Sequence, residues 1–268
     1  MTARPMPTEP KLSFQIRSTR ARKSGDREES FSLDVAFEAT PGITILFGPS
    51  GCGKSTTLAA IAGLIRPDSG RIALGDDVWF DSERGINRPP HLRGVAFVFQ
   101  SLALFPHMTA AHNVTYGMDR HLSGSEKRSR AETLLARLKV GHLADRRPAT
   151  FSGGEAQRVA LARAFAMSPR AALFDEPFSA MDRQLRKDLV ADVRSFVGEL
   201  AIPLVHVTHQ RNEARALSDH VILIEAGRVA RVGTARELLP QEVHRDMTFD
   251  ETPLGDPLQD MPEVTDRR

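Results

Sequence analysis

The hydrophobic residues of this 268-residue chain fall into short runs that alternate with amphipathic stretches. Near-continuous apolar runs stand at 43–47, 95–99, 171–174, 204–208 and 221–224. Runs of this length are typical of strands buried on both faces, and the helical patterns between them favour parallel strands covered by helices. The sequence therefore predicts an α/β core with a mainly parallel sheet.

The first forty residues follow a different pattern, in which apolar and polar positions alternate. Alternation at 12–16 and again at 31–37, on either side of the charged stretch 20–29, predicts a half-exposed hairpin. The stretch 71–80, with a turn at 75–77, is expected to add strands to it. We therefore expect an N-terminal antiparallel β subdomain.

Helical spacing replaces the strand-like runs in the middle of the chain. We interpret 101–165 as an inserted α-helical subdomain, because 125–140 has Leu134, Leu135 and Leu138 on one apolar side. A later amphipathic helix is predicted from Leu185, Leu189, Val193, Phe196 and Leu200. One domain is expected to span 12–240, and 241–268, which has few apolar residues, is expected to be a short disordered tail.

Composition and charge narrow the class of protein. The 36 basic residues nearly balance the 34 acidic ones, so no overall field favours nucleic acid or lipid. The single cysteine, Cys52, excludes an internal disulfide framework and indicates a reducing compartment. The start of the sequence lacks the apolar stretch of a secretory signal, so none is expected, and no apolar run approaches the roughly 20 residues of a membrane helix. We expect a soluble protein that borrows membrane-spanning segments from other chains if it works at a membrane.

A glycine-rich loop follows the apolar run at 43–47 and precedes a helical pattern. Its glycines let backbone N–H groups point at an anion, and the helix start adds partial positive charge. In such a loop Lys54 would bridge the β- and γ-phosphates and Ser55 would bind Mg²⁺. Cys52 is either a small residue that fits the loop or a thiol activated at the helix start. The predicted nucleotide-binding residues here are Gly48, Pro49, Ser50, Gly51, Cys52, Gly53, Lys54, Ser55 and Thr56.

Polar residues end three other predicted strands. Asp175 and Glu176 follow the run at 171–174, where Asp175 would hold Mg²⁺ and Glu176 would position water as general base. Gln100 and His209 end two more runs, where they would face the metal or the γ-phosphate. Taken singly, the Asp175–Glu176 pair could be solvated charge, His209 could be a turn residue, and Gln100 would indicate little.

The stretch 151–158 has two interpretations. Ser152 and Glu155 match a capping box that any helix could use. Gly153 and Gly154 each cost about 1 kcal/mol in a helix interior, and they suit a backbone that another molecule approaches closely. A phosphate brought by a partner subunit is such a molecule.

Together these motifs resemble those of ABC ATPases over about residues 12–240. They stand in the order GPSGCGKST at 48–56, Gln100, FSGGE at 151–155, ALFDEP at 172–177, SAMD at 179–182 and His209. The resemblance implies a P-loop NTPase (RecA-like) fold, ATP and Mg²⁺ as ligands, and two subunits arranged head to tail. Lys54, Ser55, Gln100, Asp175, Glu176 and His209 would act on the ATP bound by their own subunit. Ser152, Gly153 and Gly154 would grip the partner's ATP, and Asp182 would link the two sites.

The resemblance is greatest to importer ATPases, and within them to molybdate-import ATPases. It implies an ATPase homodimer at the cytoplasmic face of the inner membrane, two permease subunits contacted through Leu104, Phe105 and Pro106, and an external solute-binding protein. Core packing would explain the apolar residues of that segment almost as well. ATP binding would favour dimer closure and hydrolysis would release it. The alternatives are importers of sulfate, polyamine or sugar, a soluble ABC ATPase acting on DNA or ribosomes, and a small-molecule P-loop kinase.

This sequence departs from the family pattern at several places. Phe151, Glu155 and Met181 stand where relatives commonly have Leu, Gln and Leu. The stretch after residue 239 is too short for the oxyanion-binding domain common in that branch, so regulation by bound substrate is not expected. The aromatic residue that usually stacks on adenine has no clear counterpart, because 20–29 occupies its expected region and Phe14 suits the role poorly.

Overall fold

The computed structural model describes residues 10–24, 27–178 and 183–240, so the tail expected at 241–268 lies outside the described residues. Five parallel strands form the core of the sheet, in the spatial order β10-β3-β9-β8-β7. They are β3 (Gly42–Phe47), β7 (Val95–Val98), β8 (Ala171–Asp175), β9 (Pro203–Thr208) and β10 (His220–Glu225). Each coincides with a predicted apolar run to within one residue at either end, which confirms the parallel core.

Antiparallel strands extend the sheet on one side. They are β1 (Leu12–Ser24), β2 (Arg27–Ala39), β4 (Ser69–Leu74), β5 (Asp77–Asp81) and the short β6 (Ile86–Asn87). The expected hairpin is confirmed, with Leu12 opposite Ala39, and Gly75 turns the chain between β4 and β5 with φ of 57°. A further strand, β11 (Arg228–Gly233), lies antiparallel to β10 and parallel to β2. The antiparallel part is therefore continuous with the core in one 11-stranded sheet.

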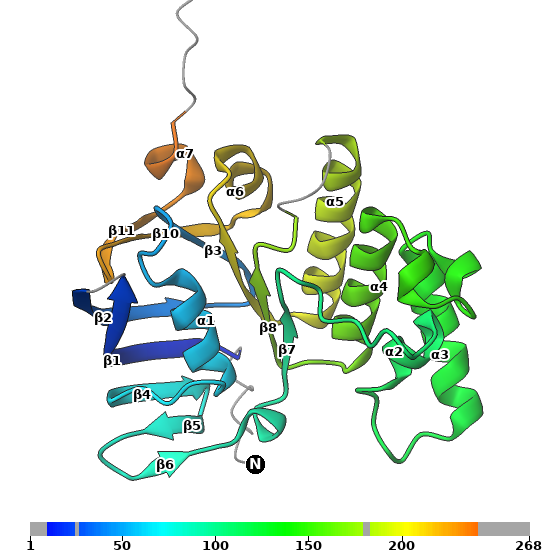
Figure 1. Cartoon of the computed structure of the whole chain (residues 1–268), viewed down its shortest axis with the longest axis horizontal. Helices are drawn as coiled ribbons and strands as arrows, with labels where there is room; N and C mark the ends of the chain where they lie inside the picture. The colour runs from blue at the N-terminus through cyan, green and yellow to red at the C-terminus, as the bar shows by residue number, and fades with distance from the viewer. Residues whose placement is uncertain (1–9, 25–26, 179–182, 241–268) are drawn as a thin grey trace, which may run out of the picture.

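Helices cover both faces of the parallel core (Figure 1). One face packs against α1 (Lys54–Ala62), and the other against α4 (Gly153–Ala166), α5 (Arg183–Leu200) and α6 (Arg211–Leu217). Alternate residues of β9 show the division, because Leu204 belongs to the hydrophobic cluster under α5 and Val205 to the cluster under α1. The fully buried β9 therefore lies between two apolar layers.

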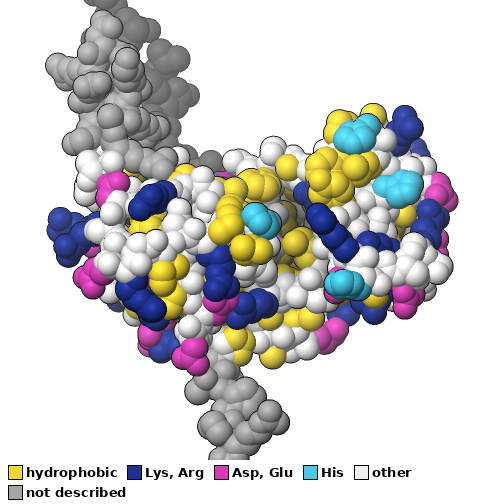
Figure 2. All heavy atoms as spheres, turned by 90° about the horizontal axis from the view of Figure 1, so that it is seen from below, with side chains coloured by type: hydrophobic (Ala, Val, Ile, Leu, Met, Phe, Trp, Pro, Cys, Tyr) yellow, Lys and Arg dark blue, Asp and Glu magenta, His cyan; other side chains and the backbone are white. Residues whose placement is uncertain are grey.

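The predicted helix at 125–140 corresponds to α3 (Gly124–Arg137), which ends near Lys139, a residue with positive φ. It packs with α4 and with α2 (Ala110–Thr115), a short helix that the apolar pattern did not reveal. Figure 1 shows α2 and α3 at the end of the molecule away from the antiparallel strands. The face seen from below carries several hydrophobic patches, one of them toward this helical end with histidines beside it (Figure 2).

The last helix, α7 (Ala235–Leu238), begins at Thr234 and packs on β10 and β11. Within residues 10–24, 27–178 and 183–240, none of the helices is long and apolar enough to cross a lipid bilayer.

Candidate active site

The glycine-rich loop joins β3 to α1, and two of its glycines are required by close contacts. A Cβ at Gly48 would lie 2.2 Å from the carbonyl oxygen of Ile224, and a Cβ at Gly53 would lie 2.6 Å from Leu33. Gly53 also has φ of 108°, in the left-handed region that glycine tolerates best. The loop can therefore fold tightly over the start of α1, where backbone N–H groups and the helix dipole favour an anion.

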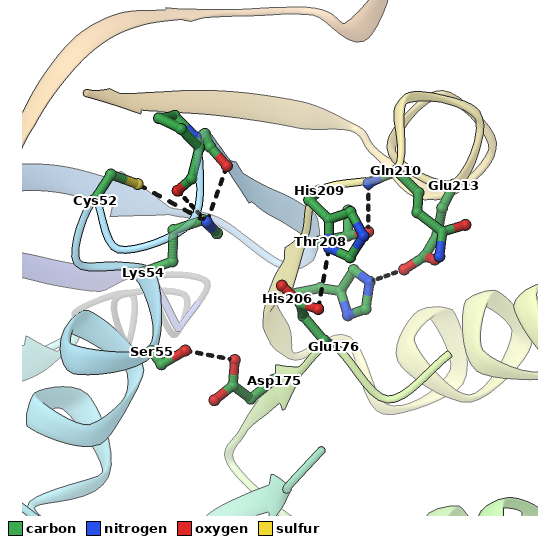
Figure 3. Close-up of polar contacts among 12 residues, drawn as sticks. Cys52, Lys54, Ser55, Asp175, Glu176, His206, Thr208, His209, Gln210 and Glu213 are labelled. Atoms are coloured by element: carbon green, nitrogen blue, oxygen red, sulfur yellow. Dashed lines mark hydrogen bonds and ion pairs between the residues drawn. The ribbon is translucent and has the colours of Figure 1, made fainter. Parts of the chain in front are cut away.

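The Lys54 ammonium is held inside this loop (Figure 3). Its Nζ donates to the carbonyl oxygens of Gly48, at 2.9 Å, and Pro49, at 2.8 Å, and lies 3.9 Å from the Cys52 sulfur. Both Lys54 and Cys52 are buried. The burial of Cys52 favours its interpretation as a small residue that completes the loop rather than an accessible thiol.

A cavity of about 490 Å³ opens beside the loop. Its lining brings together segments that are far apart in the sequence: Phe31, Ser50, Gly51, Gly53, Lys54, Ser55, Thr56, Gln100, Asp175 and Glu176. The predicted phosphate loop, Gln100, which stands two residues after β7, and the two carboxylates at the end of β8 therefore face one space. Its volume is in the range of small-molecule sites.

Ser55 and Asp175 form a pair of oxygen ligands at this cavity. The Ser55 hydroxyl donates to Oδ1 of Asp175 at 2.9 Å, although the residues are 120 positions apart. Burial raises the pKa of Asp175, and the bond from Ser55 opposes that rise. Mg²⁺ commonly takes one or two protein oxygens and keeps several waters, so this hydroxyl–carboxylate pair fits Mg²⁺ beside a phosphate.

Glu176 has an uncommon backbone conformation that aims its side chain. Its φ is 46°, in the left-handed region that costs a non-glycine residue of order 1 kcal/mol. The backbone N–H donates to the Val207 carbonyl at 3.1 Å, and one carboxylate oxygen lies 3.0 Å from Nδ1 of His209. The structure thus brings His209, at the end of β9, to the carboxylate predicted as general base.

The Ser152 turn lies at the start of α4 and forms the capping box expected from the sequence. The Ser152 hydroxyl accepts from the Glu155 N–H, and the Glu155 carboxylate accepts from both the N–H and the hydroxyl of Ser152. His142, from the 3-10 turn Gly141–Leu143, lies 3.2 Å from the same carboxylate. The pKa of Glu155 is lowered to about 2. The backbone hydrogen bond from Ser152 is the largest cause, followed by the bond from the Ser152 hydroxyl and then by the contact with His142.

The predicted site residues therefore divide into two groups. Ser152, Gly153 and Gly154 are not among the described residues that line the cavity, and Asp182 lies outside the described residues. A Cβ added at Gly153 would meet no other described atom within 4 Å, apart from its own helix backbone and chain neighbours. Nothing in the described part of this chain requires a glycine at that position.

Phe31 lines the cavity and was not predicted as a site residue. It is half-buried in β2, and a Cβ at Gly53 would lie 3.0 Å from its ring. In the sequence it belongs to the same alternating pattern as Leu33 and Val35, which indicates only a strand. By contrast Phe14 is 2% exposed and packs against Phe37 with ring centroids 5.1 Å apart.

Comparison with known proteins agrees with this arrangement. The sequence pattern of the ABC transporter family matches residues 33–179. The molybdenum import ATP-binding protein ModC of Brucella melitensis biotype 1 is 41% identical over 215 residues, which cover 80% of this chain and 59% of the relative. ModC of Pseudomonas syringae pv. tomato is 41% identical over 212 residues, covering 79% and 58%. The chain thus spans about three-fifths of the length of these relatives.

Solved structures match more completely. The dimeric ATP-binding cassette MJ0796, in a post-hydrolysis state bound to ADP and Pi, superimposes with a TM-score of 0.71 at 29% identity. The match covers 84% of this chain and 99% of that one. It confirms the predicted fold class, a P-loop nucleotide-binding fold on a mixed sheet.

Proposed function

Because the chain belongs to the ABC transporter family, we propose that it is the ATP-hydrolysing subunit of an importer for molybdate or a related oxyanion. One observation carries the catalytic part of the proposal. Lys54, Gln100 and the pair Asp175–Glu176 come from separate elements and line one cavity next to the glycine-rich loop. A triphosphate bound to the loop would contact the Lys54 ammonium and the metal site at Asp175, with Glu176 beside its terminal phosphate as the base.

Different residues would bind the phosphates, hold the metal ion and activate the attacking water. Lys54 would leave the Gly48 and Pro49 carbonyls to bind the β- and γ-phosphates, while Ser55 and Asp175 would hold Mg²⁺. When bound, Mg²⁺ would neutralise charge on the phosphate oxygens. Glu176 would accept a proton from the attacking water, with its second oxygen anchored by His209, and Gln100 would orient that water.

The Ser152 turn would act on the ATP of a second copy of the chain. Support comes from Gly153, whose open surroundings leave room for a phosphate from outside. The start of α4 supplies N–H groups and partial positive charge for that phosphate. Asp182 would lie in the segment that links the two sites, as the family resemblance implies.

Phe31 is the aromatic residue that we propose for contact with the nucleobase. It is the aromatic side chain among the described residues that line the cavity, and a Cβ at Gly53 would lie 3.0 Å from its ring. Phe31→Ala should weaken ATP binding, whereas Phe31→Tyr, which keeps the aromatic face, should preserve it.

The substrate and the partners are proposed from the relatives named above. Molybdate follows from the molybdenum import proteins. The segment after Gln100 would meet two permease subunits, which would hold the ATPase at the cytoplasmic face of the membrane. In that segment Phe105 packs on Tyr116, whose side chain is exposed, with ring centroids 4.5 Å apart. An external solute-binding protein would deliver the oxyanion to the permease.

The catalytic proposal is tested with Glu176→Gln. This variant should bind Mg-ATP with wild-type affinity, hydrolyse it at least about 100-fold more slowly, and accumulate as a dimer in size-exclusion chromatography. Adding Ser152→Arg should abolish that dimer while leaving the nucleotide affinity of the monomer intact. Wild-type turnover in Glu176→Gln would exclude Glu176 as the base, and weakened monomer binding in Ser152→Arg would exclude a role for Ser152 in trans.

The substrate is tested by reconstituting this chain in vesicles with a candidate permease and its solute-binding protein. Molybdate on the binding protein should stimulate ATP hydrolysis and accumulate inside, whereas a sugar or polyamine should do neither. Stimulation by one of those solutes alone would overturn the assignment of an oxyanion.

A further inference from the structure

A buried histidine–glutamate pair, His206 and Glu213, lies at the two ends of the segment 206–213, which carries His209. Nε2 of His206 lies 2.5 Å from Oε1 of Glu213, and the two side chains are 0% and 1% exposed. Within the part of the chain that the structure describes, the other ring nitrogen of His206 has no hydrogen-bond partner. Burying such polar groups is unfavourable unless they are paired, so this position in a fully buried strand calls for an explanation.

The pair closes the segment that carries His209 (Figure 3). His206 lies in β9 and Glu213 in the first turn of α6, so their contact joins the two ends of residues 206–213. Between them the Gln210 N–H donates to the Thr208 hydroxyl at 3.1 Å, and Arg186 of α5 donates to the Gln210 side chain. His209 is therefore presented by a short segment that is held at both ends.

The same imidazole contacts the segment that carries Glu176. The His206 ring lies 6.1 Å from the ring of Phe174, edge-on, and 5.4 Å from the ring of Phe178. Phe174 precedes Asp175, and Phe178 follows Glu176 by two residues. One buried side chain thus packs against both flanks of the carboxylate pair while it is bonded to the helix that follows His209.

Stability alone does not account for this pair. Replacing a buried ionic or polar pair with apolar residues of similar volume is often neutral or stabilising. The neighbouring residue on the same face of β9, Leu204, is apolar and belongs to the cluster that packs there. A polar pair with fixed geometry does something that an apolar pair cannot, because its hydrogen bond sets the distance and angle between β9 and α6.

We propose that His206 and Glu213 are positioning residues that hold His209 in contact with Glu176. This inference rests on the proposed ATPase function and adds two residues to it. Neither side chain lines the nucleotide cavity, so each acts through the His209 segment. Loss of the pair should let that segment shift, and a displacement of about 1 Å at a reacting group can cost up to 100-fold in rate.

The test compares two substitutions of the same residue. His206→Gln keeps an N–H donor near the position of Nε2 and should retain kcat within about twofold, whereas His206→Leu removes the donor and should lower kcat by about 10- to 100-fold. The Kd for a fluorescent ATP analogue should stay within about twofold of wild type in both, because the phosphate loop is untouched. The double variant His206→Leu/Glu213→Leu, which removes both buried polar groups, should fold as well as wild type and still show the low kcat.

A double-mutant cycle with His209→Ala tests whether His206→Leu lowers kcat through His209. If the pair acts through His209, adding His206→Leu to His209→Ala should lower kcat no further. Asp77→Asn is the control for general destabilisation, because it disturbs the partly buried bonds from Asp77 in β5 to Trp79 and to Arg170, which directly precedes β8. It should lower the Tm without changing kcat.

Three results would overturn the inference. They are a wild-type kcat in folded His206→Leu, a parallel loss of ATP affinity, and full additivity with His209→Ala. A wild-type chain that hydrolyses no ATP, alone or with its permease, would instead refute the proposed function on which the inference rests.

Discussion

Asp175 and Glu176 end strand β8 side by side, and each is held in an unfavourable state. Burial raises the pKa of Asp175, which means that its ionised form is less stable in the folded chain than in water. Glu176 has a left-handed backbone with φ of 46°. Both side chains line one cavity. These unfavourable states are explained by metal binding and water activation better than by stability.

The raised pKa of Asp175 has a consequence for stability. A carboxyl group whose pKa is higher in the folded state than in the unfolded state stabilises the fold when protonated, and that contribution is lost as pH rises through the folded pKa. Asp175→Asn should therefore raise the Tm of the nucleotide-free protein by a few degrees at pH 7.5. The gain should disappear in acid below the ordinary value of 3.8, where Asp175 is protonated in both states.

Differential scanning calorimetry across this pH range measures the effect. ATP hydrolysis should be lost in the same variant, because the amide is a poor ligand for Mg²⁺. An unchanged or lowered Tm at pH 7.5 would contradict the argument. Ser55→Ala is the matched comparison, since it removes the bond that stabilises the Asp175 carboxylate and should lower the Tm.

Helix α4 is attached at one end to the Ser152 turn and near the other to the segment after Gln100. Arg163 in α4 donates to the carbonyl oxygens of Ala103, at 2.6 Å, and Leu102, at 2.8 Å. Both acceptor residues have positive φ, 60° for Leu102 and 45° for Ala103, so their turn is strained. Burial lowers the pKa of Arg163. The planar guanidinium donates to both carbonyl oxygens of this strained turn at once, which a side chain with a single ammonium could not do in the same geometry.

Removing the two hydrogen bonds of the Arg163 guanidinium should destabilise the protein. Arg163→Ala leaves two carbonyls without their charged donor and should cost about 1–3 kcal/mol of unfolding free energy in urea. Arg163→Lys should fall between Ala and wild type, because one ammonium cannot reproduce the planar fork. Arg128 on α3 is the control: its ion pairs with Glu132 and Asp145 are exposed and screened by solvent, so Arg128→Ala should cost clearly less than Arg163→Ala. Equal costs at the two positions would refute the role assigned to Arg163.

One continuous sheet carries the whole nucleotide cavity. Phe31 comes from the antiparallel strands, and Lys54, Gln100 and Glu176 follow strands of the parallel core. The Ser152 turn is among the predicted site residues that do not line this cavity, as are Gly48, Pro49, Cys52 and His209. A single chain therefore contains a cavity that can bind ATP, while the interaction with Ser152 would require a second chain.

This division predicts how ATP stabilises the protein. A non-hydrolysable ATP analogue with Mg²⁺, at about 100 times its Kd, should stabilise the monomer by about 2.7 kcal/mol. At about 2–4 °C per kcal/mol this raises the Tm by roughly 5–10 °C. Ser152→Arg should show the same shift, and Lys54→Ala should show almost none. A smaller shift in Ser152→Arg would mean that the turn contributes to binding within one chain.

Local signals in the sequence were sufficient for the parallel strands, the phosphate loop and the capping box at Ser152. Apolar runs, glycine spacing and a Ser–x–x–Glu cap act over a few residues, so their structural meaning does not depend on distant partners. The same logic placed Asp175, Glu176, Gln100 and His209 at strand ends. Those ends meet at one edge of a parallel sheet.

Tertiary structure alone decided the rest, because those contacts join residues without a local pattern. Phe31 has the signal of any strand residue, and only the approach of Gly53 brings it to the cavity. In the sequence His206 is only one polar residue in an apolar run. Its role depends on the contact with Glu213, which the next helix brings to it. The strained turn at Leu102 becomes stable only when Arg163 reaches it from 61 residues away. Pairing energies of this kind exist only once the elements are packed together.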